Sequence, residues 1–286
     1  MTGATNGVEE LDAMFDAAFG ITSTWMKGAD GQWVYARVTP SEKSKLEFYA
    51  KLYKEGLLDP EYLTKKWDTK EQVFYEGKAG LVAGVAPGSL DVYANKMMKT
   101  QDTTIVALPP PAGKAQGLSP FVDVTKEARG FAIPTTSKVK DAAFAVIDFM
   151  WSPAGLKIAK LGMPGIHYVE EANRYVLTDK YSEWYNGWFG DSFNGFDPDK
   201  ALSRPIMTPA AVDAGKLATK YMLPDKTFLI PEQYVTNGDA MTNLYKEYCA
   251  DIVTGKKPIS AFDEFVQKWY KAGGTELTKY AATKLK

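Results

Sequence analysis

Apolar side chains recur every three or four residues along several stretches of this chain, which is the spacing of one face of an α-helix. The clearest stretch covers residues 40–55. Its apolar face carries Leu46, Tyr49, Ala50 and Tyr53. Thr39 is expected to cap the start of this helix, with Glu42 completing a capping box, and Gly56 to end it. Leu57 is then expected to fold back onto the last turn.

Other stretches predict a mixture of helices and short strands. Two apolar runs, 22–25 and 33–38, flank a polar turn and predict a β-hairpin. Further strands are expected at 79–83, 103–108 and 128–133. Further helices are expected at 9–19, 69–75, 92–98, after Ser137, at 153–162, 209–221, 237–254 and 261–271. Separated strands among many helices indicate an α/β fold.

Charge and cysteine content exclude several classes of function. The 286 residues include 34 basic and 35 acidic ones, for a net charge of −1. No concentrated basic surface for nucleic acid or anionic lipid is therefore expected. Cys249 is the single cysteine, so no disulfide framework or cysteine metal site can form, and we expect it to be buried.

The single histidine, His167, limits the possible chemistry further. It excludes zinc sites that need two histidines, and no G-x-S-x-G motif accompanies it. We interpret it as a structural or ligand-contacting histidine within the sequence PGIHY. Asp191, Asp197 and Asp199 lie among aromatic residues, so a glycosidase-type carboxylate pair stays open as a less favoured alternative.

Aromatic residues form 13% of the chain and have two interpretations. Trp25 and Trp33 lie on the predicted hairpin, and Trp188 lies in an irregular aromatic segment over 162–205. Such rings either fill a core or present flat faces to a sugar. A glycine-rich run from Gly80 to Gly88 matches no phosphate-binding motif, and Ser89 after it begins a helix beside a possible cleft.

Three ordered segments carry a family resemblance. They are LEFYAKLYKEGLLDPEY with QVFYEGKAGLVAGVAPGS, the run from ALPPPAGKAQG through ARGFAIPTTS to FMWSPAG, and the helical tail with GKKPIS and FDEFVQKW. Together they resemble the family-1 extracellular solute-binding proteins of ABC importers, of the lipoprotein-like, carbohydrate-binding type. The resemblance implies an α/β, periplasmic-binding-protein-like fold of type II.

The same resemblance implies a domain division and a truncation. One nearly complete lobe would comprise 1–122 and 166–286, and 123–165 would be part of the second lobe. The signal peptide, lipid-anchored cysteine and first βαβ units of the family are not found before this point. We therefore expect an extracellular protein, anchored by lipid in its full-length form, of which this chain is the later portion.

By resemblance the function is binding without catalysis, cofactor or metal. Two lobes would close on a sugar or oligosaccharide, and the closed form would dock on an ABC permease. The binding protein itself is expected to be a monomer. The alternative is a sensory or glycan-interaction module on the same fold. Positions carried over from the family as ligand contacts are Ser89, Asp91, Tyr93, Glu127, Arg129, Gln233, Tyr234 and Asn237. Trp25, Trp33, His167 and Trp188 are added from the residue types themselves.

Overall fold

The computed structural model describes residues 1–2, 9–101, 103–121, 131–184 and 199–285. The chain divides into two compact units. Unit 1 comprises Met1–Lys126 and Pro209–Lys286, and unit 2 comprises Glu127–Thr208. The second boundary differs from the predicted return at residue 166, because residues 166–208 belong to unit 2. Which lobe of a complete binding protein each unit represents stays a prediction.

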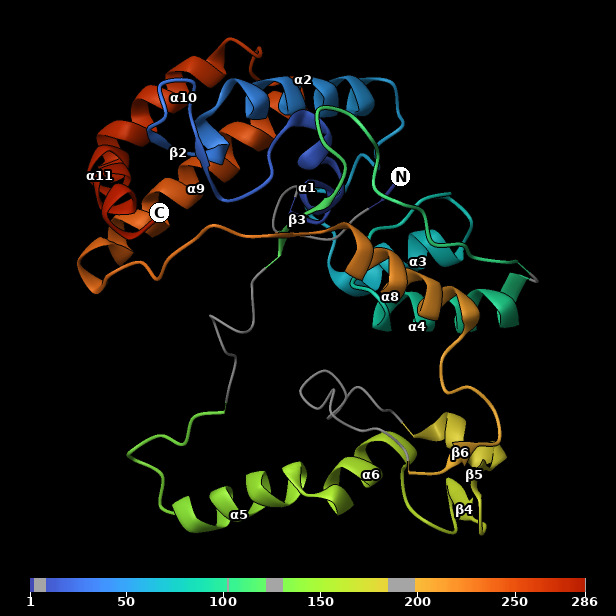
Figure 1. The fold of residues 1–286 in the computed structure, drawn as a ribbon. Helices are drawn as coiled ribbons and strands as arrows, with labels where there is room; N and C mark the ends of the chain where they lie inside the picture. Colours follow the sequence, from blue (N-terminus) through green and yellow to red (C-terminus); the bar gives the residue numbers. More distant parts are fainter. Residues whose placement is uncertain (3–8, 102, 122–130, 185–198, 286) are drawn as a thin grey trace. The chain divides into compact units, whose positions relative to one another are not determined.

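Unit 1 is mainly helical, with two small two-stranded sheets (Figure 1). Its helices are α1 (Glu9–Phe15), α2 (Pro40–Lys54), α3 (Trp67–Tyr75), α4 (Gly88–Gln101), α8 (Pro209–Tyr221), α9 (Glu232–Val253), α10 (Ala261–Trp269) and α11 (Thr275–Lys284). Strands β1 (Trp25–Lys27) and β2 (Trp33–Tyr35) are antiparallel, and β3 (Leu118–Phe121) is parallel to β7 (Met222–Pro224). The mixed architecture confirms the predicted α/β class.

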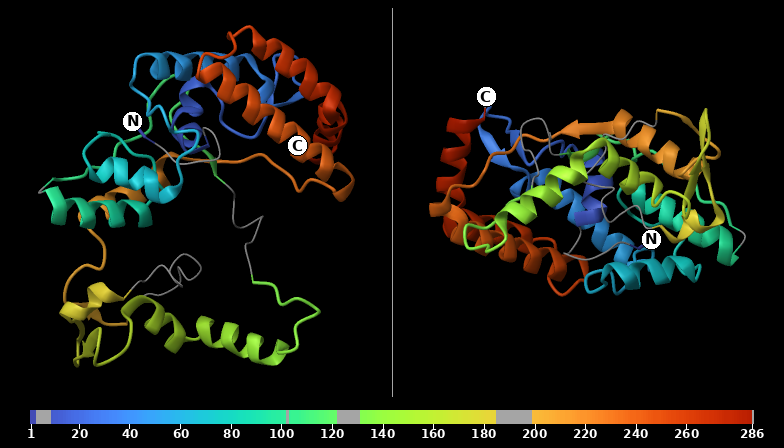
Figure 2. Two further views of the ribbon diagram at one scale, coloured as in Figure 1. Left: turned by 180° about the vertical axis from the view of Figure 1, so that it is seen from behind. Right: turned by 90° about the horizontal axis from the view of Figure 1, so that it is seen from below.

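The core of unit 1 lies where α2, α9 and α10 pack together. Tyr35 of β2 stacks on Trp269 of α10 with ring centroids 5.1 Å apart, which ties the hairpin to this helical layer. Cys249 is buried in the same core, as expected. Helices α4 and α8 lie side by side in a separate part of the unit (Figure 1, Figure 2).

A cluster of buried charges lies beneath the hairpin. The carboxylates of Asp12, Asp16 and Glu42 surround the side chains of Arg37 and Lys45. Glu42 therefore does not return to the backbone of Thr39, and the predicted capping box is wrong. The Thr39 hydroxyl does accept the Glu42 N–H at 3.4 Å, so the predicted N-cap is confirmed.

Several predicted strands do not form. Residues 103–108 contain no strand, and in 79–83 only Val82 forms an isolated bridge, with Thr2. The predicted strand at 128–133 lies partly outside the described residues. Leu57 is 55% exposed, and it is Leu58 that folds back into the core. Apart from the bridge to Thr2, neither short apolar run pairs with a strand among the described residues of unit 1, so an apolar run alone does not make a strand.

Unit 2 combines two helices with a three-stranded sheet. Helices α5 (Lys140–Trp151) and α6 (Pro153–Leu161) pack on each other. Strands β4 (Tyr168–Glu170), β5 (Arg174–Leu177) and β6 (Ala201–Leu202) follow. Its small core consists of Leu161, Tyr168, Tyr175, Leu177 and Tyr181. Helix α5 buries no residue, and Phe144, Phe149 and Trp151 on it are all more than half exposed.

Candidate functional site

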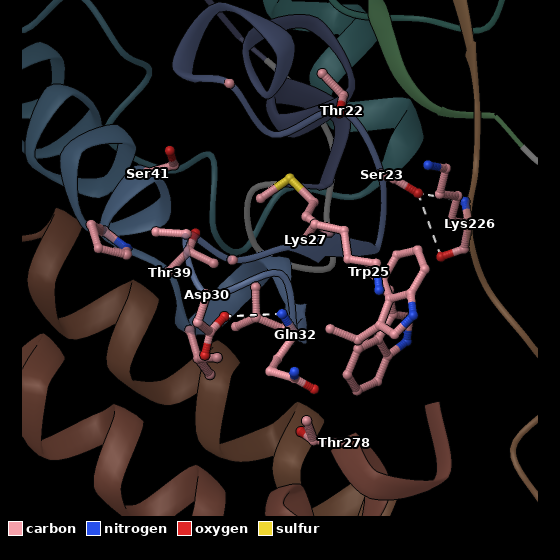
Figure 3. A pocket seen from close by; sticks show the side chains of 18 of the residues that line it. Thr22, Ser23, Trp25, Lys27, Asp30, Gln32, Thr39, Ser41, Lys226 and Thr278 are labelled. Atoms are coloured by element: carbon pink, nitrogen blue, oxygen red, sulfur yellow. Dashed lines mark hydrogen bonds between the residues drawn. The ribbon is translucent and has the colours of Figure 1, made fainter. Parts of the chain in front are cut away.

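A pocket of about 1060 Å³ opens on unit 1 between the hairpin and the start of α2. The segment that follows β7 forms another wall, and Tyr270 and Thr278 complete the lining (Figure 3). Every lining residue belongs to unit 1, so a single compact unit defines the shape of this site. Its volume is slightly above the usual range for small-molecule sites, about 300–1,000 Å³.

The hairpin turn supplies the polar edge of the pocket. The Gly28 N–H donates to the Gln32 carbonyl at 2.8 Å, and Gly31 takes a positive φ of 75° that favours glycine. The Asp30 carboxylate accepts the Gln32 N–H at 3.0 Å (Figure 3). These contacts fix a tight turn, and they present Lys27, Asp30 and Gln32 along one side of the pocket.

The opposite wall is held by Asp225. Its carboxylate accepts hydrogen bonds from the Ser23 hydroxyl at 2.8 Å and from the Thr24 N–H at 2.7 Å. The Thr24 hydroxyl adds a third bond at 2.8 Å. The Lys226 N–H donates to the Ser23 hydroxyl (Figure 3). The Lys226 carbonyl accepts the Trp25 N–H. Lys226 is thereby fixed beside β1, about 200 residues away in sequence.

Trp33 also lines the pocket. Only 5% of this residue is exposed, and Lys27 Nζ lies 4.2 Å from the centroid of its ring. Lys226 Nζ lies 5.7 Å from the same ring. Both positions allow cation–π attraction, which orients the two ammonium groups toward this ring.

The rest of the lining mixes hydrogen-bonding groups with apolar ones such as Met26, Val34 and Leu223. Hydroxyls come from Thr22, Thr39, Ser41 and Thr278, and an amide comes from Gln32. Burial raises the pKa of the Tyr270 phenol, and the nearby Asp30 carboxylate raises it further, so this hydroxyl stays protonated and able to donate. Such a set can recognise a polar solute through many hydrogen bonds.

Metal binding finds no support in the part of the chain that the structure describes. No group of three or more histidine, cysteine, aspartate or glutamate side chains there could hold an ion. Nor, within the described ranges, is any one helix long and apolar enough to cross a membrane. The bent pair α5 and α6 passes that test by length and composition only.

Of the predicted ligand contacts, Trp25 and Trp33 line the pocket and both are buried. Trp25 packs against Tyr35 and Phe228 at 5.5 Å between ring centroids, so most of its surface belongs to the core. Neither tryptophan presents the open face that stacking on a sugar requires. Their assignment as ligand contacts stays a prediction, restricted to the edges that reach the pocket.

Ser89, Asp91 and Tyr93 lie in the first turns of α4, apart from the pocket lining. The Ser89 hydroxyl accepts the Val85 N–H at 3.2 Å, which ties the loop before α4 to the first turn of the helix. Tyr93 is buried in a small apolar cluster with Phe74. Their current contacts are thus structural, and a role in binding stays a prediction.

Gln233, Tyr234 and Asn237 lie near the start of α9. Tyr234 packs on Tyr280 of α11 with ring centroids 5.8 Å apart. Neither Tyr234 nor Asn237 lines the pocket. The structure therefore groups the predicted residues of unit 1 into three separate places.

His167 belongs to unit 2 and closes a turn there. Its Nδ1 accepts the Met163 N–H at 2.8 Å, and its ring lies 5.1 Å from that of Trp184. This contact fits the structural interpretation of the histidine. Glu127, Arg129 and Trp188 lie outside the described residues, as do Asp191 and Asp197. Asp199 accepts a hydrogen bond from the Tyr175 hydroxyl at 2.6 Å.

Sequence reasoning missed Lys27, Asp30, Gln32 and Lys226 as pocket residues. The first three carry a readable signal, because the polar turn GADGQ follows an apolar strand and must project its side chains outward. Lys226 carries none, since only the tertiary contact of Asp225 with Ser23 and Thr24 brings it to the hairpin.

Comparison with known proteins defines the class. The family model for bacterial extracellular solute-binding proteins matches residues 9–157, a little more than half of the chain. This chain therefore belongs to the bacterial extracellular solute-binding proteins, a family of binding proteins. A relative from Niallia circulans, described as an uncharacterized protein in the butB 5′ region, is 26% identical over 250 residues, covering 82% of this chain and 96% of its own.

Solved structures share the fold over nearly the whole chain. The alginate-binding protein AlgQ2 matches 99% of this chain with a TM-score of 0.70 and 17% identity. A solute-binding protein of Bifidobacterium longum infantis that binds human milk oligosaccharides (HMO) matches 92%, with a TM-score of 0.58 and 20% identity. The N-glycan transport protein NgtS of Streptococcus pneumoniae matches 99%, with a TM-score of 0.55 and 16% identity. These matches show a periplasmic-binding-protein-like fold.

Length separates this chain from those solved relatives. It spans 63% of the alginate-binding protein, 56% of the Bifidobacterium protein and 62% of NgtS. What those longer proteins do is therefore not transferred to this chain by the shared fold alone.

Proposed function

We propose that this chain is the solute-binding part of an ABC importer that captures an oligosaccharide and delivers it to a membrane permease. The observation that carries the proposal is the polar pocket of unit 1, found in a member of a solute-binding family. The solved relatives named above, whose descriptions include alginate, milk-oligosaccharide and N-glycan proteins, support a carbohydrate as the ligand.

The pocket is suited to a sugar for chemical reasons. Hydroxyl groups of a sugar both donate and accept hydrogen bonds, and the side chains of Thr22, Ser41 and Gln32 in the lining can do the same. Lys27 and Asp30 add charged partners, whose hydrogen bonds are stronger. An extracellular location, a lipid anchor on the complete protein and a monomeric state belong to the same proposal.

The test is the thermal stability of the 286-residue protein in the presence of defined oligosaccharides. A ligand at about 100 times its dissociation constant adds about 2.7 kcal/mol to the free energy of unfolding. Gln32→Ala removes an exposed amide from the pocket, so it should reduce the shift produced by the best sugar. Gln267→Ala, on the exposed face of α10, is the matched control and should leave that shift unchanged.

Two results would overturn the proposal. One is the absence of any shift across neutral and acidic oligosaccharides from three to six units long. The other is a shift that Gln32→Ala and Gln267→Ala affect equally, because the pocket would then not be the site that binds the sugar.

A further inference from the structure

Two positive charges face the same aromatic ring in the pocket. Lys27 Nζ and Lys226 Nζ lie 4.2 Å and 5.7 Å from the centroid of Trp33. Their separation therefore cannot exceed the sum of these distances. Neither lysine forms an ion pair with a carboxylate in the part of the chain that the structure describes. Both lysines are exposed to solvent, and an anion that lies near both ammonium groups is attracted by each of them.

The acids closest to these lysines in the chain are engaged elsewhere. Asp225, next to Lys226, has both carboxylate oxygens bonded to Ser23 and Thr24 of the hairpin. Asp30 uses one oxygen to close the turn through the Gln32 N–H. The lining thus holds two lysines against one aspartate, in a protein whose net charge is −1.

A third lysine extends the positive edge. Lys114 Nζ lies 3.5 Å from the hydroxyl of Ser41, which lines the pocket. The methylene chain of Lys114 also packs closely over Gly20, another lining residue, where a Cβ would come within 3.0 Å of it. The positive charge is therefore a property of the pocket and its rim, because lysines from three separate segments meet there.

We propose that this pocket selects an acidic oligosaccharide and holds its carboxylate or sulfate group between Lys27 and Lys226. Each ammonium group is a compact charge with three donors, which suits an anionic oxygen. Gln32 and Ser41 can contribute hydrogen bonds to the hydroxyls of the same sugar. The inference rests on the proposed solute-binding function and adds the chemical class of the ligand.

Titration calorimetry on the 286-residue protein, at low and at physiological salt, tests the inference. The probes are tetragalacturonate, tetramannuronate, a sulfated chondroitin tetrasaccharide and neutral maltotetraose. The methyl ester of tetragalacturonate is the matched neutral ligand, since it keeps the sugar and removes the charge. Comparison of the uronates with the sulfated sugar shows which anion the site takes.

The inference predicts that one acidic sugar binds at least about tenfold more tightly than its neutral counterpart. Lys27→Gln and Lys226→Gln should each weaken that binding about tenfold, and added salt should weaken it further. Lys51→Gln, which removes an exposed charge from α2 away from the pocket, should have no effect.

Other results overturn the inference in distinguishable ways. If neutral sugars bind as tightly as acidic ones, or if acidic sugars bind and both pocket lysine variants retain full affinity, the inference fails and the proposed function stands. If none of the probes binds to the unmodified protein, the inference fails, and the wider series of oligosaccharides tested by thermal stability decides the proposed function.

Discussion

Lys45 Nζ lies 2.6 Å from Asp16 Oδ1, with both side chains buried in unit 1. The same ammonium group contacts Asp12 at 2.6 Å and Glu42 at 3.1 Å. Burial raises the pKa of Asp16, and the charges on Lys45 and Arg37 oppose that rise. Three buried carboxylates are thus neutralised by only two cations, Arg37 and Lys45.

Removal of this lysine should destabilise unit 1 strongly. Lys45→Met keeps the length of the side chain but leaves the three carboxylates with Arg37 alone. The expected loss is about 3–5 kcal/mol in the free energy of unfolding, because buried charges lose their partner. Urea unfolding followed by tryptophan fluorescence measures it.

The matched control is Lys43→Met in the same helix. Lys43 pairs with Asp263 at 2.7 Å, but both side chains are substantially exposed to water. Its loss should therefore stay within about 1 kcal/mol. Equal stability of the two variants would contradict the view that the buried cluster holds this part of the fold.

A second prediction concerns the stability of the protein at low pH, which depends on Asp59. Burial pushes the pKa of Asp59 up, but hydrogen bonds from Thr2, the Glu61 N–H and Lys65 together outweigh it and hold that pKa below its usual value. A lowered pKa in the folded state stabilises the protein above the pKa of the unfolded chain, about 3.9. This contribution is lost as pH falls through the folded-state value.

Asp59→Asn should therefore cost stability at pH 7, and the difference from the unmodified protein should shrink below about pH 4. Urea midpoints measured at intervals from pH 7 to pH 2.5 give this difference directly. A difference that stays constant over the whole range would show that the charge of Asp59 contributes nothing.

The sequence predicted the elements whose start and end signals are local. Helix α2 carries Thr39 and Pro40 at its start and Gly56 after its end, and α6 has Ser152 and Pro153 at its start. The hairpin carries its glycine-bearing turn. In each case neighbouring residues satisfy the backbone groups, so no distant contact is needed to place the element.

Elements that depend on distant partners were not predicted. Strand β3 pairs with β7, about 100 residues later, whereas residues 103–108 pair with no strand in the described part of the chain despite their apolar character. The pocket follows the same rule. Trp33 was found from its residue type, whereas Lys226 reaches the site only through hydrogen bonds made by Asp225.

Unit 2 offers a local test of capping. The Ser152 hydroxyl accepts the Gly155 N–H at 3.1 Å and donates to the Phe149 carbonyl at 2.6 Å, joining α5 to α6. Ser152→Ala should destabilise α6 by about 1 kcal/mol. Amide hydrogen exchange of α6 measures this loss. Ser182→Ala, an exposed serine of the same unit, should leave the exchange of α6 unchanged; equal effects would contradict the capping role.

Cys249 should be inert in the folded protein. The residue is 2% exposed, and burial raises the pKa of its thiol well above the usual range, which disfavours the reactive thiolate. A thiol reagent at pH 8 should react only on unfolding in urea. Ser44→Cys, at an exposed position of α2, is the control that should react at once. Rapid labelling of Cys249 without urea would contradict its burial.

The last prediction concerns the wall of the pocket. Asp225→Asn replaces a carboxylate that accepts three hydrogen bonds from Ser23 and Thr24 by an amide, whose NH₂ group faces donors. The expected loss is about 1–3 kcal/mol of unfolding free energy, because buried donors lose a charged acceptor. Asp213→Asn, which affects only an exposed pair with Lys216, is the control and should change stability little. A double-mutant cycle with Thr24→Val isolates the contact. The double variant should lose less unfolding free energy than the sum of the two single losses, whereas full additivity would show that Asp225 does not act through Thr24.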